Sequence, residues 1–170
     1  MALLVLVGGA RSGKSSLAVR LAGDHGVPVV FIATAEARDD DEMAERIEHH
    51  RAGRPATWET VEEPLQLLDA LEAAPAESCV VVDCLSLWVA NLLERGDDAE
   101  EAAAVAAKAA AVRSAPTIAV TNEVGMGVVP ETPLGRAYRD VLGRVNAIWA
   151  EAADESYFVV AGKALRLSDA

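Results

Sequence analysis

A glycine-rich segment near the start of the chain has the residue types that bind a phosphate group. Residues 8–15 read Gly-Gly-Ala-Arg-Ser-Gly-Lys-Ser and match the pattern G-x-x-x-x-G-K-[ST] in full. Glycines permit a tight turn in which successive N–H groups face one anion. In such a loop the lysine neutralises the β- and γ-phosphates, and the last hydroxyl is offered to Mg²⁺. The segment therefore predicts a nucleoside triphosphate site made of Gly8, Gly9, Ala10, Arg11, Ser12, Gly13, Lys14 and Ser15.

A carboxylate at a second position suits the same site. Asp83 directly follows the apolar run Cys79–Val82, so we expect it at the end of a buried strand. A carboxylate there is placed to help organise Mg²⁺ together with the Ser15 hydroxyl. The alternative is that Asp83 only caps the N-terminus of the next helix, which is a common place for Asp.

The two adjacent histidines, His49 and His50, are the next residues that could do chemistry. They are followed by Arg51 and by Gly53, a typical helix stop, in a chain that is otherwise acidic. Neutral imidazole is a nucleophile toward phosphorus, and with a pKa of about 6.5 most of it is neutral near pH 7. The alternative is that these cations only favour a helix C-terminus. Spacing alone leaves both interpretations open.

Apolar runs of strand length alternate with helical patterns throughout the sequence. Continuous apolar strands are typical of a parallel sheet buried between two helix layers, so we expect an α/β three-layer sandwich with a mostly parallel sheet. The predicted strands are Leu3–Val7, Val29–Ala33, Cys79–Val82, Thr117–Val120 and Tyr157–Ala161, with a weaker one at Thr57–Val61 and a possible C-terminal hairpin strand at Lys163–Leu167. The predicted helices are Ser15–Asp24, Asp40–Arg51, Pro64–Ala74, Leu85–Leu93, Asp97–Arg113 and Leu134–Ala153.

Two groups of apolar residues lead to further expectations about packing. The Asp97–Arg113 helix is rich in alanine and has a weak apolar stripe, which favours an exposed or edge position. Large apolar residues elsewhere are numerous for one small domain, so some are expected at contacts between subunits. These residues are Leu87, Trp88, Leu92, Ile148 and Trp149.

Composition limits the classes of partner. The chain has 170 residues, which predicts a single domain spanning 1–170, and its net charge of −12 argues against nucleic acid and anionic membranes. No apolar run reaches the roughly 18 residues of a membrane-spanning helix, and residues 1–7 lack the basic start of a signal peptide. Cys79 and Cys84 are too few for a disulfide framework, so we expect two partly buried thiols in a cytoplasmic protein.

Several segments taken together resemble one enzyme family over nearly the whole chain, from about Leu3 to Leu167. Besides the glycine-rich loop, they are Phe31–Ala35, Arg46-Ile47-Glu48-His49-His50-Arg51, Arg54-Pro55 with Trp58, Thr60 and Glu62, Val82–Trp88 and Thr121–Pro130. This series resembles the bifunctional adenosylcobinamide kinase / adenosylcobinamide-phosphate guanylyltransferase family of cobalamin biosynthesis. The Arg-Ile-x-His-His and Thr-Asn-Glu-Val-Gly-Met-Gly segments are specific to it, whereas the glycine-rich loop is shared with many kinases.

The resemblance implies two reactions on one fold. ATP or GTP phosphorylates the aminopropanol hydroxyl of adenosylcobinamide, and GTP then transfers GMP to a histidine, from which the cobinamide phosphate takes it to give adenosyl-GDP-cobinamide. His49, the first histidine of the pair, corresponds to the GMP acceptor. Besides the glycine-rich loop, the nucleotide contacts that the resemblance implies are Ala33, Thr34, Ala35, His50, Arg51, Ala52, Gly53, Glu62 and Asp83. The family fold resembles the RecA-like P-loop sheet, and the resemblance implies a homo-oligomer, with a trimer as the expected form.

Two other functions are compatible with the residues alone. The chain could be a plain P-loop kinase of another small alcohol, with His49 only a cation at a helix end. It could also be a nucleotide-binding regulator without transfer chemistry. The segment Asn122–Pro130, with its two glycines, is expected to be a functional loop, whose ligand is either corrinoid or a neighbouring subunit.

Overall fold

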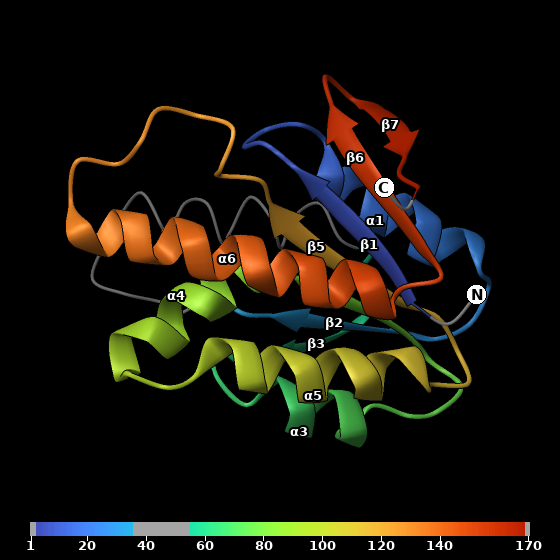
Figure 1. Cartoon of the computed structure of the whole chain (residues 1–170). Helices are drawn as coiled ribbons and strands as arrows, with labels where there is room; N and C mark the ends of the chain where they lie inside the picture. The colour runs from blue at the N-terminus through green and yellow to red at the C-terminus, as the bar shows by residue number, and fades with distance from the viewer. Residues whose placement is uncertain (1–2, 36–54, 169–170) are drawn as a thin grey trace.

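In the part of the chain that the structure describes, seven strands form one sheet with the order β3-β2-β4-β5-β1-β6-β7 (Figure 1). The computed structural model describes residues 3–35 and 55–168. All neighbouring strands are parallel except β6 and β7, which form an antiparallel hairpin. The strands are β1 Leu3–Gly8, β2 Val29–Ala33, β3 Glu59–Glu62, β4 Cys79–Asp83, β5 Thr117–Asn122, β6 Glu155–Val160 and β7 Lys163–Arg166.

The four central strands carry the continuous apolar runs of the sequence. The side chains of β1, β2, β4 and β5 are almost all buried, because helices cover both faces of this part of the sheet. The strand predicted at Thr57–Val61 lies at Glu59–Glu62, where most of its residues are exposed at the sheet edge. The predicted three-layer α/β architecture and the C-terminal hairpin are confirmed.

The helices of the described residues cover the two faces unequally. Helix α1, Lys14–Asp24, packs on one face, and α3 Leu67–Ala73, α4 Leu85–Arg95, α5 Ala99–Ala111 and α6 Pro133–Ala152 lie on the other (Figure 1). The helix predicted over Asp40–Arg51 lies outside the described residues. The single domain predicted for residues 1–170 stays a prediction, although β1 pairs directly with β6 near the other end of the chain.

The alanine-rich helix α5 corrects one expectation. An exposed or edge position was expected for it, yet its alanines Ala103, Ala106 and Ala110 have no exposed surface and belong to the main apolar core. Alanine has no bulk that would hold helices apart, so α5 packs closely between α3 and α6. A weak apolar stripe therefore marks a closely packed helix here, because small side chains contribute little to hydropathy.

The structure narrows the expectation about subunit contacts to two residues. Trp88, Leu92 and Trp149 are at most 5% exposed and lie in the core of the chain itself, so only the half-buried Leu87 and Ile148 remain candidates for subunit contacts. The indole N–H of Trp88 donates a hydrogen bond of 2.8 Å to the carbonyl of Leu65, which fixes the loop before α3. Ile148 is half-buried against this core, and Leu87 is half-buried against a second apolar cluster on the α1 face of the sheet.

The two thiols are more deeply buried than expected. Cys79 and Cys84 are both free, and they are 0% and 9% exposed. No helix among the described residues is long and apolar enough to cross a membrane.

Candidate active site

The glycine-rich loop joins β1 to α1 at the C-terminal edge of the sheet. Gly8 is the last residue of β1, and the helix begins at Lys14 after Gly13, whose φ of 100° is a left-handed conformation that favours glycine. The Lys14 side chain is only 6% exposed, and its ammonium donates a 2.7 Å hydrogen bond to the carbonyl of Gly9. The loop thus encloses its own cation, next to the positive end of a helix.

The C-terminal hairpin supports this loop from the side. The N–H of Gly162, at the tip between β6 and β7, donates a hydrogen bond of 2.9 Å to the carbonyl of Ser12. A Cβ on Gly8 would lie 2.1 Å from the carbonyl oxygen of Val159, so only glycine lets β6 approach here. Sequence reasoning missed this support, because it joins residues from opposite ends of the chain.

Asp83 lies at the same sheet edge, two strands away from β1. It is the last residue of β4 and is half-buried, while β5 separates β4 from β1. The alternative that Asp83 caps the next helix is wrong, because the N-cap residue of α4 is Cys84 and it makes no side-chain capping bond. Asp83 is therefore a strand-end carboxylate that shares an edge with the phosphate-binding loop.

Thr34 holds the chain on the C-terminal side of Asp83. Its hydroxyl accepts a hydrogen bond of 2.8 Å from the N–H of Cys84 and donates one of 2.7 Å to the carbonyl of the same residue. The N–H of Thr34 also donates to the carbonyl of Asp83 at 3.2 Å. Since the Thr34 side chain is completely buried, its hydroxyl acts on the backbone that positions Asp83. This finding gives the predicted nucleotide contact Thr34 a positioning role.

Cys84 adds no charge to the site. Burial and the neighbouring Asp83 carboxylate raise the pKa of its thiol above the usual value. The sulfur lies 2.9 Å from the hydroxyl of Ser86, in the first turn of α4. The thiol therefore stays protonated near neutral pH, and it adds no negative charge that would repel a nucleoside triphosphate here.

The residues expected from β2 and β3 lie further along the edge. In the sheet register Ala33 pairs with Asp83 on one side and with Glu62 on the other, and Glu62 is exposed. With strands about 4.8 Å apart, the end of β2 is about 14 Å from the end of β1, and the end of β3 is about 19 Å away. One end of the candidate site is thus a phosphate-binding loop, and the other end carries Ala33 and Glu62.

The strand between Asp83 and the phosphate-binding loop also ends in polar residues. Asn122, at the end of β5, pairs with Gly8, and the N–H of Glu123 donates to the carbonyl of Gly8 at 3.0 Å. Asn146 of α6 accepts a hydrogen bond of 2.6 Å from the Thr121 hydroxyl and donates one of 3.0 Å to the carbonyl of Asn122. This buried network, which sequence reasoning did not assign, fixes where the loop after β5 begins.

The structure brings together most of the predicted site residues that it describes. The loop residues Gly8–Ser15, together with Ala33, Thr34, Glu62 and Asp83, all lie at the C-terminal edge of the sheet, and half-buried Ala35 directly follows Thr34. Residues of the histidine segment lie outside the described residues; they are His49, His50, Arg51, Ala52 and Gly53.

The glycine-rich loop between β1 and α1 and the strand order define a nucleotide-binding protein of the P-loop NTPase class. A solved structure with a similar fold is the flagellar accessory protein FlaH from Methanocaldococcus jannaschii, with a TM-score of 0.54 and 16% sequence identity. The match covers 98% of this chain and 77% of FlaH, and at this identity it supports the fold alone.

Residues 4–167 match the family model of cobinamide kinase / cobinamide phosphate guanyltransferase, and the chain belongs to this family. It is 46% identical over 164 residues to the bifunctional adenosylcobalamin biosynthesis protein CobP of Pseudomonas aeruginosa, a match that covers 93% of this chain and 92% of CobP. It is 41% identical to CobU of Salmonella typhimurium and 43% identical to CobU of Escherichia coli, with 97% of this chain and 99% of each relative covered. The family resemblance inferred from the motifs is confirmed.

Proposed function

We propose that this chain phosphorylates the aminopropanol hydroxyl of adenosylcobinamide with ATP or GTP and then transfers GMP from GTP to the product, giving adenosyl-GDP-cobinamide. The observation that carries the proposal is the family match over residues 4–167, which includes a fully formed phosphate-binding loop. A plain kinase of another small alcohol, or a regulator, would account for the loop but not for the match outside it.

The first half-reaction uses the β1 end of the site. The loop amides and the Lys14 ammonium bind the β- and γ-phosphates and stabilise the charge that spreads over the γ-phosphoryl oxygens. The acceptor hydroxyl oxygen bonds to the γ-phosphorus and releases its proton to solvent, and the bond from the γ-phosphorus to the β–γ bridging oxygen breaks. A nucleoside diphosphate leaves, and no protein nucleophile is needed.

Mg²⁺ is part of the proposal because the oxygens near the loop suit it. Ser15 lies in the first turn of α1 and Asp83 at the end of β4, and both are half-buried. Mg²⁺ prefers few protein oxygens together with phosphate oxygens and water. The described residues form no group of three or more His, Cys, Asp and Glu side chains that would make a complete metal cage. When bound, Mg²⁺ would neutralise phosphate charge, with Ser15 and Asp83 holding it.

The second half-reaction assigns a nucleophile to His49, on the basis of the family resemblance. The neutral imidazole nitrogen attacks the α-phosphorus of GTP, and pyrophosphate leaves as the P–O bond breaks. A phosphate oxygen of cobinamide phosphate then attacks the same phosphorus, the N–P bond breaks, and the imidazole is released. The contacts to the nucleotide would come from Ala33, Ala35 and Glu62 and from the segment His50–Gly53.

Assembly and location complete the proposal. We place the protein in the cytoplasm because nucleoside triphosphates are available there, and because both cysteines are free thiols, as is usual in that compartment. We also propose a homo-oligomer, most simply a trimer, as the family resemblance implies.

The test is to incubate the wild-type protein with GTP and Mg²⁺ and to measure its intact mass. The expected result is an added mass of one GMP, with release of pyrophosphate. The adduct should be lost in acid and stable in base, as a phosphoramidate is, and peptide mapping should place it on His49. A wild-type protein that binds GTP but forms no adduct would overturn the guanylyltransferase assignment, and a kinase assay with adenosylcobinamide tests the first half-reaction separately.

A further inference from the structure

The loop between β5 and α6 exposes an unusual amount of apolar surface. Its side chains Met126, Val128 and Val129 are 79%, 95% and 62% exposed, and Leu134 in the first turn of α6 is 69% exposed. These four side chains are called the apolar loop surface below. Residues 124–130 carry no charge, although the whole chain has a net charge of −12.

This exposure is not the result of a loosely held segment. The carboxylate of Glu123 accepts a hydrogen bond from the N–H of Gly125. The Arg136 guanidinium donates to the carbonyls of Pro130 and Glu131 at 2.9 and 2.8 Å. The hydroxyl of Thr132 caps α6 by accepting from the N–H of Gly135 at 3.0 Å. Local bonds thus fix the backbone at the two ends of the loop, at Gly125 and at residues 130–135, while the apolar side chains between these ends are exposed to solvent. An exposed apolar patch with anchored ends is typical of a binding surface.

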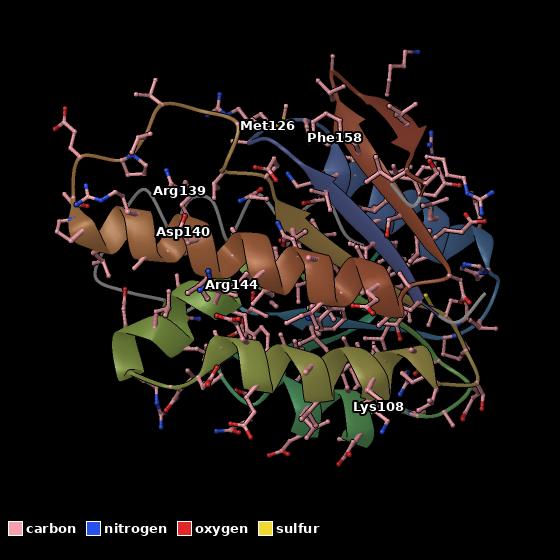
Figure 2. The ribbon with its side chains drawn as sticks, in the orientation of Figure 1. Lys108, Met126, Arg139, Asp140, Arg144 and Phe158 are labelled. Atoms are coloured by element: carbon pink, nitrogen blue, oxygen red, sulfur yellow. The ribbon has the colours of Figure 1, made fainter. Side chains whose placement is uncertain are left out.

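The apolar loop surface begins beside the phosphate-binding loop. Gly8 has Asn122 on one side and Val159 on the other in the sheet register, and the N–H of Glu123 donates to the carbonyl of Gly8. Figure 2 shows the Met126 side chain at this end of the sheet, above the C-terminal end of β1. The Met126 end of the apolar loop surface therefore lies at the sheet edge that carries the phosphate-binding loop (Figure 2).

We propose that the apolar loop surface binds the corrin macrocycle of the acceptor substrate and so positions its hydroxyl for phosphorylation; this inference rests on the proposed function. The reacting hydroxyl of cobinamide is on a side arm, so the ring must be held beside the phosphate-binding loop and not within it. The edge of a corrin ring carries methyl and amide groups without negative charge. Uncharged valines and a deformable methionine suit such a ligand.

A second copy of the chain is the alternative occupant, because the protein is proposed to be a homo-oligomer. The position of Met126 above the C-terminal end of β1 (Figure 2) favours the cobinamide ring, which has to lie near the phosphate-binding loop for its hydroxyl to be phosphorylated. The oligomeric state is nevertheless measured in the test, because a subunit contact at the same place would give a different result.

The test compares the double variant Met126→Ser/Val128→Ser with wild type in the kinase reaction. Since both side chains are almost fully exposed, the substitutions leave the core intact. Loss of their burial against the ring should raise KM for adenosylcobinamide about tenfold or more. KM for the nucleotide and the yield of GMP adduct from GTP alone should not change. Val112→Ser is the matched control, because Val112 is 77% exposed beyond the end of α5, at the opposite edge of the sheet from the phosphate-binding loop.

Two results would overturn the proposal. One is a KM for adenosylcobinamide within about twofold of wild type in the double variant. The other is a change of oligomeric state in sedimentation, which would make the apolar loop surface a subunit contact. Failure of the proposed function is distinguishable from both, because the wild-type protein would then neither phosphorylate adenosylcobinamide nor form the GMP adduct.

Discussion

The hydroxyl of Thr34 is the sharpest point at which to test how the site is held together. Thr34→Val keeps nearly the same side-chain shape but removes the hydroxyl that bonds both the N–H and the carbonyl of Cys84. The carbonyl keeps a partner, because the N–H of Trp88 donates to it at 3.2 Å. The N–H of Cys84, which is buried, loses its acceptor on Thr34. The substitution therefore removes two bonds and takes away the hydroxyl that satisfies one buried donor.

The expected cost follows from these two bonds. A buried donor without a partner costs about 1–3 kcal/mol, and a lost bond to a carbonyl that keeps another partner costs about 0.5–1.5 kcal/mol. We therefore expect Thr34→Val to lower the free energy of unfolding by about 1.5–4.5 kcal/mol. For a chain of this length, that corresponds to a decrease in Tm of about 3–18 °C. Because Asp83 directly precedes Cys84, kcat of the kinase step should fall as well.

The assay is urea unfolding followed by circular dichroism, with kinase kinetics on the same preparations. Thr34→Ser is the control, since serine retains the hydroxyl and loses only a methyl group, and it should retain most of the stability and activity. If Thr34→Val unfolds with the same midpoint and slope as wild type, the hydroxyl is not needed to satisfy the Cys84 backbone. A normal Tm with lost activity would instead show that Thr34 contacts the nucleotide directly.

Four other predictions concern single residues. Lys14→Ala should abolish the use of triphosphate in both half-reactions, because charge neutralisation in the loop is lost; kinase assays and adduct formation measure this, and near-normal turnover would contradict it. His49→Ala should stop formation of the GMP adduct but leave the kinase step, whereas His50→Ala should only weaken transfer, and mapping of the adduct to another residue would refute the assignment. Asp83→Asn, which is nearly isosteric, should lower kinase turnover sharply with an unchanged Tm, and an unchanged Mg²⁺ dependence would exclude a metal role. Burial raises the pKa of Cys79 from 9.0 to about 11, so the stability that its neutral thiol contributes is complete below pH 9 and is lost as the pH rises toward 11. Urea midpoints across that range should fall less steeply in Cys79→Ala than in wild type.

The sheet could be predicted from the sequence because its central strands are apolar on both faces. Leu3–Val7, Val29–Ala33 and Cys79–Val82 have no polar residue to interrupt them, and each agrees with an observed strand to within one residue. The edge strand β3 was placed two residues too early at its start, because its exposed residues follow no burial pattern. The burial of α5 was missed because alanine contributes close packing without a strong hydropathy signal.

The position of Asp83 could be predicted, because a carboxylate that ends an apolar strand must lie at the sheet edge. The role of the Thr34 hydroxyl could not be predicted, since it depends on hydrogen bonds to Cys84, fifty residues away in the chain. The same holds for Gly162, which supports Ser12 from the other end of the sequence. Local sequence patterns thus predict the strands, the helices and the polar residues at their ends. Hydrogen bonds between segments that are distant in the sequence can be assigned only from the folded structure.

The central position of β1 has a consequence for synthesis on the ribosome. The strand that carries the phosphate-binding loop is made long before its neighbours β5 and β6, and the N–H of Leu3 donates a hydrogen bond to the carboxylate of Asp154, 151 residues later. At about 5–20 residues per second, the apolar β1 waits about 8–30 s for these neighbours. The nascent chain must therefore keep this apolar strand from aggregating until β6 emerges, and the phosphate-binding loop gains the support of Gly162 only after that.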